Sequence, residues 1–272
     1  MNFRTQKIAM TAVAAVAALS LAACGGSTTA TDSPTDSTST APDLGLISSG
    51  TLTVCSDVPY APFEDFDSSA PSGFKGFDVD IVQKVADGLG LKLKILDEDF
   101  DGLQSGLTLN AGTCDLVVSA LTITADRAKN LDYTEGYFDA DQSLLVPTGS
   151  AITGIADLSG KKVAVQKGTT GADYAKAHAT GADIVTFDDD AGEFQALKAG
   201  QVDAILQDLP VNVAHAQAGG YSVVETYKTN EEYGMAAKKG NDALVAAINT
   251  EIEKIKADGD YKTIYDKYFT AS

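Results

Sequence analysis

The chain has 272 residues, of which 44% are hydrophobic and 21% are charged, and its formal net charge is −18 at pH 7. Such an acidic surface argues against nucleic acid as a partner and against an electrostatic attraction to anionic lipid. It leaves the sign of a buried site open, since a buried site can differ in charge from the surface.

The N-terminus predicts export. Arg4 and Lys7 precede an apolar run, residues 8–23, that is too short to span a bilayer as a mature helix. The run ends in Leu21-Ala22-Ala23-Cys24, which resembles the lipobox of bacterial lipoproteins, where the cysteine is acylated. We therefore predict a signal peptide over residues 1–24, lipidation of Cys24 and an extracytoplasmic protein anchored to the cell membrane. An ordinary secretory signal with an incidental cysteine is the alternative.

Residues 25–43 consist of Gly, Ser, Thr, Ala, Asp and Pro, and they carry no side chain that could build a core. We predict a disordered tether there. From Leu44 to Ser272 the composition becomes that of a globular protein, and the length suits two lobes of roughly 100 residues each.

Strand and helix patterns alternate along this globular part. The first half predicts strands at 52–55, 91–95 and 116–120 and helices at 77–89 and 100–110. The alternation restarts near Leu158, with strands at 162–166, 184–187, 202–206 and 221–224 and helices at 172–179, 193–199 and 211–218. Two C-terminal helices, 242–256 and 261–269, are expected to pack back on the first lobe. This order predicts parallel sheets with right-handed crossovers.

A short repeated sequence pattern supports two similar lobes. Ala111-Gly112-Thr113-Cys114-Asp115 and Ala199-Gly200-Gln201-Val202-Asp203 both end a helix at Gly and open a buried strand at Asp. We predict an α/β fold of two lobes, each a mainly parallel sheet flanked by helices, with residues 44–145 and 236–272 in one lobe and 146–235 in the other. The carboxyl ends of the strands would then face a shared crevice, where open α/β sheets bind ligands.

Cys55 and Cys114 form an even pair in an exported domain, which permits a disulfide. If their strands are parallel neighbours, the register puts the two cysteines about three residues apart, too far for a direct bridge. Two buried free thiols are therefore the alternative.

Four motifs occur in order and at suitable spacing: Gly76-Phe77-Asp78-Val79-Asp80, Ala120-Leu121-Thr122-Ile123-Thr124-Ala125-Asp126-Arg127, Gly168-Thr169-Thr170-Gly171 and Gln207-Asp208. Together they resemble the polar amino-acid solute-binding proteins of ABC importers, a family that includes glutamine- and histidine-binding proteins, over about residues 50–269. The resemblance implies a type II periplasmic-binding-protein-like fold that hands an amino acid to a permease and its ATPase. It implies no cofactor, no metal and no catalysis, and we expect a monomer.

A zwitterionic ligand needs a partner for each of its charges when it is buried. Arg127 presents a planar fork that suits the α-carboxylate, and it lies in the first turn of a helix that we expect Thr124 to cap. In the second lobe the turn of Thr169 and Thr170 opens a helix whose free N–H groups suit the same carboxylate. A solvated helix arginine and a plain threonine N-cap are the structural alternatives.

The α-ammonium needs acceptors, and Asp208, at the end of its strand, is the charged one. The Ala120 carbonyl and the Thr122 hydroxyl face it from the other lobe, beside Ser119 at the same strand end. A helix cap before Pro210 is the alternative role of Asp208. Asp78 and Asp80 are read as structural caps of a helix start.

The family's stacking positions fall on Tyr60 and Phe100, which would hold the ligand's apolar stem unless both simply pack in the core. Asp57 would face the end of the ligand side chain and repel an acidic one, while Gln166 and Gln207 add neutral hydrogen-bonding groups. The resemblance therefore implies a polar uncharged or cationic amino acid. Ala120 replaces a pocket serine of basic-specific relatives, and Gln166 and Gln207 replace the Lys and His of glutamine-specific ones, so the exact amino acid stays open.

Two other function classes remain. Dehydratases acting on arogenate or cyclohexadienyl substrates resemble this fold, so fold alone does not exclude an enzyme. A sensor module that binds an amino acid without feeding an importer is the second, although it would need a separate signalling partner. His178 and His215 lie alone in helical stretches and are expected at the surface.

Overall fold

The structure, a computed structural model, describes residues 43–270. The predicted signal peptide, the lipidation of Cys24 and nearly all of the predicted tether lie outside the described residues. Among residues 43–270, no helix is both long enough and apolar enough to cross a membrane.

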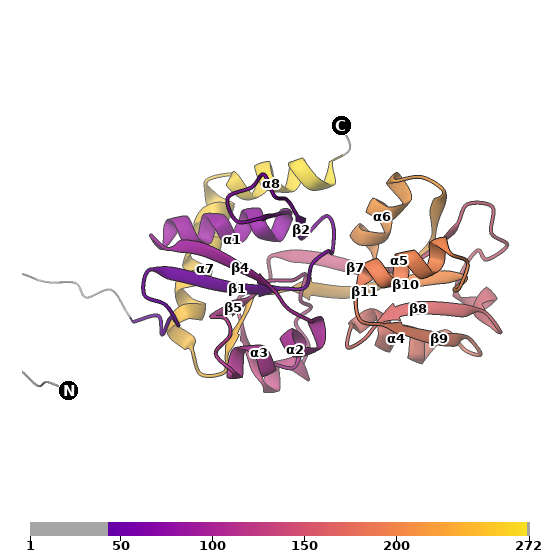
Figure 1. Cartoon of the computed structure of the whole chain (residues 1–272), viewed down its shortest axis with the longest axis horizontal. Helices are drawn as coiled ribbons and strands as arrows, with labels where there is room; N and C mark the ends of the chain where they lie inside the picture. The colour runs from indigo at the N-terminus through magenta and orange to yellow at the C-terminus, as the bar shows by residue number, and fades with distance from the viewer. Residues whose placement is uncertain (1–42, 271–272) are drawn as a thin grey trace, which may run out of the picture. The chain divides into compact units, whose positions relative to one another are not determined.

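Two five-stranded sheets organise the described chain into two lobes (Figure 1). The sheet of the first lobe contains, in spatial order, β4 (Lys92–Asp97), β1 (Thr51–Ser56), β5 (Leu116–Val117), β12 (Ala236–Lys238) and β6 (Leu131–Tyr133). The sheet of the second lobe contains β11 (Tyr221–Tyr233), β7 (Phe138–Pro147), β10 (Ala204–Asp208), β8 (Lys162–Gln166) and β9 (Asp183–Phe187). A small hairpin joins β2 (Asp65–Phe66) to β3 (Phe74–Lys75).

Both sheets are mixed, whereas the sequence predicted mainly parallel ones. Strands β4, β1 and β5 run parallel, but β12 and β6 join them antiparallel. In the second lobe β9, β8 and β10 run parallel, and β7 and β11 are antiparallel. The antiparallel strands are those next to the connections between the lobes, which an argument from strand–helix alternation does not detect.

Helices cover both faces of the first sheet. Along β1, Leu52 and Val54 enter one buried cluster and Cys55 enters another, as the alternation of side chains across a strand requires. Helices α1 (Phe77–Gly88), α7 (Asp242–Ala257) and α8 (Asp260–Phe269) contribute to the first cluster, and α2 (Phe100–Gln104) and α3 (Leu107–Asn110) to the second. The two C-terminal helices therefore pack on the first lobe, as predicted.

The second lobe repeats this arrangement on a smaller scale. Its helices are α4 (Thr170–His178), α5 (Asp190–Lys198) and α6 (Leu209–Gln217). Each lobe also contains a short 3₁₀ turn: η1 (Arg127–Lys129) in the first lobe and η2 (Ile155–Leu158) in the second. Helix α4 packs on one face of the sheet through Ala172 and Ala175, and α5 on the other through Ala196 and Leu197. Because β9, β8 and β10 run parallel, the residues that end these strands lie at one common edge of the sheet.

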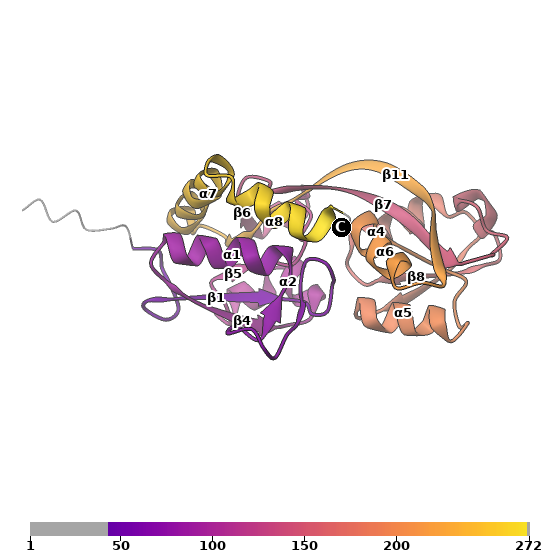
Figure 2. The same ribbon diagram turned by 90° about the horizontal axis from the view of Figure 1, so that it is seen from above.

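Two long strands connect the lobes. Strand β7 carries the chain from the first lobe into the second sheet, and β11 carries it back to β12 (Figure 2). The pair is antiparallel from Tyr233–Phe138 to Tyr221–Pro147, with two register shifts along β11. A pair of strands that crosses between two lobes is a natural place for hinge rotation.

The disulfide that the sequence left open is present in the structure. Cys55 is bonded to Cys114, with 5.8 Å between their Cα atoms. The predicted register is right, because Cys55 pairs with Val117 and Cys114 comes three residues earlier. The inferred separation is wrong, because Cys114 precedes β5 in a turn after Gly112 and is not extended alongside β1.

This bridge makes a direct prediction. A fragment beginning at Leu44 should show no free thiol when it is unfolded without reductant, and two after reduction. Thiol titration in denaturant measures this. Two reactive thiols in the unfolded, non-reduced protein would contradict the bridge, and the reduced sample serves as the control because it must give the full count.

Candidate functional site

The carboxyl ends of the parallel strands from the two lobes meet. Asp57 directly follows β1, and Gln166 is the last residue of β8. The Gln166 amide donates to Asp57 Oδ2 at 2.5 Å and to the Asp188 carbonyl at 2.9 Å. Burial raises the pKa of Asp57 to about 7, against the opposing effect of the Gln166 hydrogen bond. Two predicted ligand-binding residues from different lobes are thus in direct contact.

Asp208 ends β10 and is buried. Its carboxylate accepts hydrogen bonds from the hydroxyls of Tyr60 (2.9 Å) and Tyr233 (2.5 Å) and from the Gln142 amide (2.5 Å). Burial and the nearby charge of Glu231 raise the pKa of Asp208 to about 6. Asp208 precedes α6 but makes no side-chain cap there, so its alternative role as a helix cap is not realised.

Arg127 lies in η1, and its side chain is buried. Its Nη1 donates to the Thr122 carbonyl at 2.8 Å, and its Nη2 donates across the lobes to the Gly168 carbonyl at 3.0 Å. The guanidinium lies over the Phe100 ring, 5.3 Å from its centroid, so Phe100 supports the arginine as well as the buried cluster behind it. Burial lowers the pKa of Arg127, and the neighbouring acidic groups, among them Asp208 and Glu231, oppose that shift.

Neither of these two buried charges has an ion-pair partner among residues 43–270. The side-chain contacts of Asp208 come from neutral donors, and the hydrogen bonds of Arg127 go to carbonyl oxygens. Buried charges without partners are unfavourable, and a molecule with both signs of charge would compensate both.

The predicted threonines have two different roles. The Thr122 hydroxyl donates to Glu231 Oε2 at 2.9 Å from the first lobe, and the Thr170 hydroxyl donates to the same oxygen at 2.6 Å from the second. Thr169 instead caps α4: its hydroxyl accepts from the Ala172 N–H and donates to the Gln166 carbonyl. The hydroxyl of Thr169 is therefore used within its own lobe.

The strand end at Ser119 and Ala120 is held by buried carboxylates. The Ser119 hydroxyl accepts from the Asp57 N–H and donates to Glu64 at 2.8 Å. Ala120 has φ +43°, a left-handed conformation that is unusual for a residue with a side chain, and its N–H donates to Asp78 Oδ2 at 2.8 Å. Such strain in a non-glycine residue is typical of functional loops.

The sequence predicts that Asp78 caps α1, and this prediction is wrong. The cap residue is Gly76, with no side-chain cap bond, and the Asp78 carboxylate accepts from the Ala120 N–H and the Tyr137 hydroxyl. It therefore fixes the strained site loop. Asp80 is also no cap, because it accepts from Lys267 and Tyr268 and ties α1 to α8.

Gln207 faces the interior of the second lobe. Its amide nitrogen donates to Asp190 at 2.9 Å and to Asn212 at 3.1 Å, and its Oε1 is buried without a hydrogen-bond partner. His215, expected at the surface, is part of the same group, since it lies 2.8 Å from Asp190. The amide nitrogen of Gln207 is therefore already used within the second lobe, and only its Oε1 is left to accept a hydrogen bond.

Sequence reasoning missed three residues at the centre of this cluster: Gln142 on β7 and Glu231 and Tyr233 on β11. Gln142 contacts Asp208, Thr170 and Glu231, and is fully buried. All three lie on the connecting strands, and no motif marks them. The one sequence signal was the polar Gln142 just before the apolar end of β7, Leu144–Val146.

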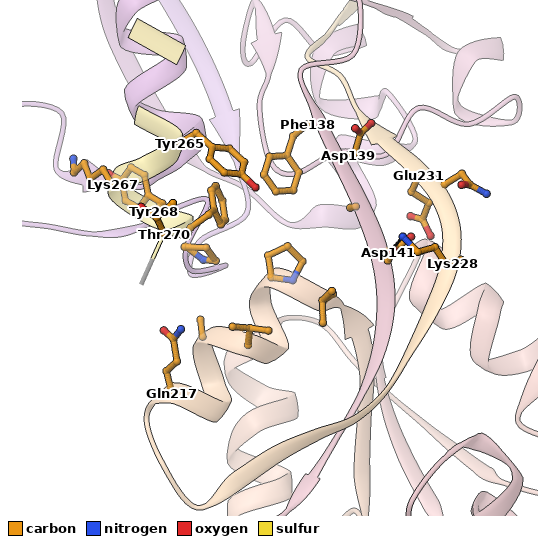
Figure 3. A pocket seen from close by; sticks show the side chains of 18 residues that line it. Phe138, Asp139, Asp141, Gln217, Lys228, Glu231, Tyr265, Lys267, Tyr268 and Thr270 are labelled. Atoms are coloured by element: carbon orange, nitrogen blue, oxygen red, sulfur yellow. Dashed lines mark ion pairs between the residues drawn. The ribbon is translucent and has the colours of Figure 1, made fainter. Parts of the chain in front are cut away.

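A separate pocket of about 740 Å³ lies between α6 and α8, beside the connecting strands (Figure 3). Tyr265 of α8 and Phe138 of β7 lie on one side of it and Gln217 of α6 on the other (Figure 3). None of the predicted ligand-binding residues lines this pocket, and Glu231 is the one residue it shares with the cluster around Asp208.

Known proteins similar to this chain agree with the fold. A probable histidine-binding protein of Neisseria gonorrhoeae is 34% identical over 95% of this chain and 94% of its own length. A glutamine-binding protein of an ABC transporter from Bacillus subtilis is 37% identical over 71% of this chain and 72% of its own. The solved structure of an ancestral arginine-binding protein bound to arginine is 37% identical, covers 81% of this chain and 98% of its own, and has a TM-score of 0.76.

Residues 52–271 match the model of the bacterial extracellular solute-binding proteins, family 3. The match includes both lobes and every residue of the cluster described above. The chain therefore belongs to the family 3 bacterial extracellular solute-binding proteins.

Proposed function

We propose that this chain is the extracytoplasmic substrate-binding component of an amino-acid ABC importer. The observation that carries the proposal is the pair of buried, opposite charges, Arg127 and Asp208, that lack ion-pair partners within residues 43–270. The α-carboxylate and α-ammonium of an amino acid supply the two missing charges. Relatives named for binding histidine, glutamine and arginine support the same ligand class.

Capture follows from the division of the site between the lobes. Arg127 belongs to the first lobe and Asp208 to the second, so neither lobe alone compensates a zwitterion. Contacts that link the lobes, such as Arg127 with Gly168 and Asp57 with Gln166, require the lobes to be together. The ligand would therefore favour the closed form by a hinge motion along β7 and β11.

The charge balance favours a cationic side chain over a neutral polar one. Asp57, Asp208 and Glu231 face the cluster, and Arg127 is the only cation that contacts it within the described residues. A bound zwitterion leaves this balance unchanged, whereas a cationic side chain near Asp57 offsets one negative charge. An acidic ligand would add a further one, so aspartate and glutamate are the amino acids we expect to be rejected.

Asp57 makes this side-chain assignment testable through pH. Burial raises its pKa to about 7, and a bound cation beside it would favour the ionised form. Binding a basic amino acid below that pH must therefore release a proton. The affinity should fall by up to about tenfold for each pH unit below about 7, with the Asp208 carboxylate adding to the loss below about 6. Calorimetry in buffers of different ionisation enthalpy measures both affinity and proton release.

Asp57→Asn is the matched variant, because it keeps the shape and removes the titrating group. It should bind the basic amino acid more weakly at pH 8 and lose the dependence between pH about 6 and 7. A wild-type affinity that does not change with pH across this interval would show that Asp57 does not lie beside the ligand's cation.

We further propose that Cys24 carries a lipid anchor, that the protein is a monomer, and that residues 44–145 with 236–272 and residues 146–235 make up the two lobes. The lipobox-like sequence and the apolar run before it support the anchor. Metabolic labelling with a radioactive fatty acid should label the wild type and leave Cys24→Ser unlabelled. Label on both, or on neither, would overturn the anchor.

A thermal-shift screen of the twenty amino acids against the fragment from Leu44 tests the main proposal. Arginine, lysine, histidine or glutamine should raise the melting temperature, and aspartate and glutamate should not. Loss of uptake of that amino acid in a strain lacking the protein would separate an importer component from a sensor. Release of phenylpyruvate or phenylalanine from prephenate- or arogenate-like substrates would instead favour the dehydratase alternative.

A further inference from the structure

Two carboxylates converge on one amide at the junction of the two connecting strands. Gln142 Nε2 donates to Asp208 Oδ1 at 2.5 Å and to Glu231 Oε1 at 3.1 Å. Asp208 ends β10 in the second lobe, Gln142 lies on β7, and Glu231 lies on β11. Because one nitrogen reaches both acids, their oxygens lie within a few ångström of a common point.

The other side-chain donors to these two acids are all neutral hydroxyls. Asp208 accepts from Tyr60 and Tyr233, and Glu231 accepts from Thr122 and Thr170. Arg127 lies close enough for its charge to be felt, but its two Nη atoms donate to backbone carbonyls. Two like charges, the buried Asp208 and the half-buried Glu231, thus share a single amide and lack a direct cationic contact within residues 43–270, an arrangement that costs free energy.

A second observation points to a ligand at this place. Gln142 is fully buried, yet its Oε1 has no hydrogen-bond partner. The Gln142 nitrogen contacts Asp208, Glu231 and Thr170, so only the oxygen of this carboxamide is left without a partner. Burial and the charge of Glu231 both raise the pKa of Asp208, so a bound cation would stabilise the ionised form of this carboxylate.

We propose that Glu231 is a second carboxylate of the α-ammonium subsite, so that the ligand's ammonium is held by the pair Asp208 and Glu231 and not by Asp208 alone. The inference rests on the proposed function, since it names a further residue of the same site. An ammonium carries three N–H donors and one positive charge, which suits two carboxylates that converge on a point. Glu231 would then select ligands that carry a free α-ammonium.

An alternative role for Glu231 is purely mechanical. Its Oε2 joins hydroxyls from the two lobes, Thr122 and Thr170, so it could hold the closed form without touching the ligand. The two roles differ in one measurable way. A closure contact changes the affinity for every ligand by the same factor, whereas an ammonium partner changes it only for ligands that carry the ammonium.

Calorimetry with a pair of ligands exploits this difference. The probes are L-arginine and L-histidine, each compared with the α-hydroxy acid that has the same side chain and carboxylate but no ammonium. In Glu231→Gln we expect the affinity for the amino acid to fall about tenfold to a hundredfold and that for the hydroxy acid by less than about threefold. Equal losses for both ligands, or no loss for either, would overturn the proposal.

Glu232→Gln is the matched control. It is the next residue on β11, its side chain is exposed, and its backbone carbonyl keeps the bond to the Ile123 N–H. Its preference for amino over hydroxy acid should equal that of the wild type. Near-identical thermal unfolding of the two variants would show that Glu231→Gln folds, because the substitution keeps the side-chain shape.

The pH profile gives a second readout, which tests the electrostatic coupling between Glu231 and Asp208. The titratable and charged groups facing Asp208 are Tyr60, Tyr233, Glu231, Arg127 and, from α5, Glu193. Removing the charge of Glu231 should lower the pKa of Asp208, so the acid-side loss of amino-acid affinity should move to lower pH. An unchanged profile in Glu231→Gln would count against the pair. A wild type that binds no amino acid would overturn the proposed function itself, whereas normal binding by Glu231→Gln would overturn only this inference.

Discussion

Arg127→Ala, in the fragment from Leu44, is expected to bind its amino acid about thirtyfold to several thousandfold more weakly than the wild type. Removing one partner of a buried charge pair costs roughly 2–5 kcal/mol. The loss has two parts here, because Arg127 would meet the ligand carboxylate and also donates to the Gly168 carbonyl across the lobes. Calorimetry at neutral pH measures the total.

Three comparisons separate these parts. Arg127→Lys keeps the charge but lacks the planar fork that reaches both the Thr122 and Gly168 carbonyls, so an intermediate affinity is expected. Lys129→Ala removes an exposed cation of the same turn, paired only with Asp126, and should bind normally. Wild type should prefer an amino acid over its α-carboxamide, and Arg127→Ala should lose that preference. Near-normal binding by Arg127→Ala would remove the arginine from the site.

Strands and helices with a clear apolar period were predictable from the sequence. Helix α1 and strand β8 were found almost to the residue, because their buried positions recur with the period of the element. Strand β11 was recognised only over Tyr221–Val224, although it runs to Tyr233. Its later part is rich in Glu, Lys, Thr and Asn, since it connects lobes and has little core to face, and such residues carry no strand signal.

Two other differences arise from backbone geometry. The helix predicted over residues 100–110 is two helices, because Gly106 between α2 and α3 has φ +79°, which ends a right-handed turn. The strand predicted to reach Ala120 stops at Val117, because the chain turns at Ala120 to present its N–H to Asp78. The turn at Ala120 depends on a contact distant in sequence, which periodicity does not contain.

The residues of the candidate site also fall into those that the sequence predicts and those that depend on the fold as a whole. Residues at strand ends, such as Asp57, Gln166 and Asp208, were predictable because parallel strands bring their carboxyl ends to one edge. Gln142 and Glu231 were not, because their strands are antiparallel connections whose partners are set by the fold as a whole. A threonine at a helix start could also not be assigned to cap or ligand from sequence, and the structure gives Thr169 the cap and turns Thr170 toward Glu231.

Asp208→Asn should weaken amino-acid binding by a factor similar to that of Arg127→Ala while making the free protein more stable at pH about 8. The folded-state pKa of about 6 lies above the ordinary value of 3.8. The folded state therefore prefers the protonated acid, and keeping it ionised costs free energy that is absent below about pH 4, grows as the pH rises to about 6 and stays constant above. A difference of roughly two units corresponds to a few kcal/mol, about 3 at most.

The substitution keeps the two tyrosine hydrogen bonds, but a turn of the Gln142 amide toward the new Asn gives up its hydrogen bond to Glu231, so the net gain should stay below the full electrostatic cost. The Asn oxygen can accept from Tyr60 and Tyr233, and the Gln142 amide can turn so that its oxygen, now without a partner, accepts from the new amide. Denaturant unfolding at pH about 8 and about 4 measures the difference, which should vanish at the lower pH. Asp183→Asn, at the exposed start of β9, should change neither stability nor binding. An Asp208→Asn protein that is less stable than the wild type at both pH values would show that this carboxylate stabilises the fold. Normal amino-acid binding by this variant would show that the carboxylate does not contact the ligand's ammonium.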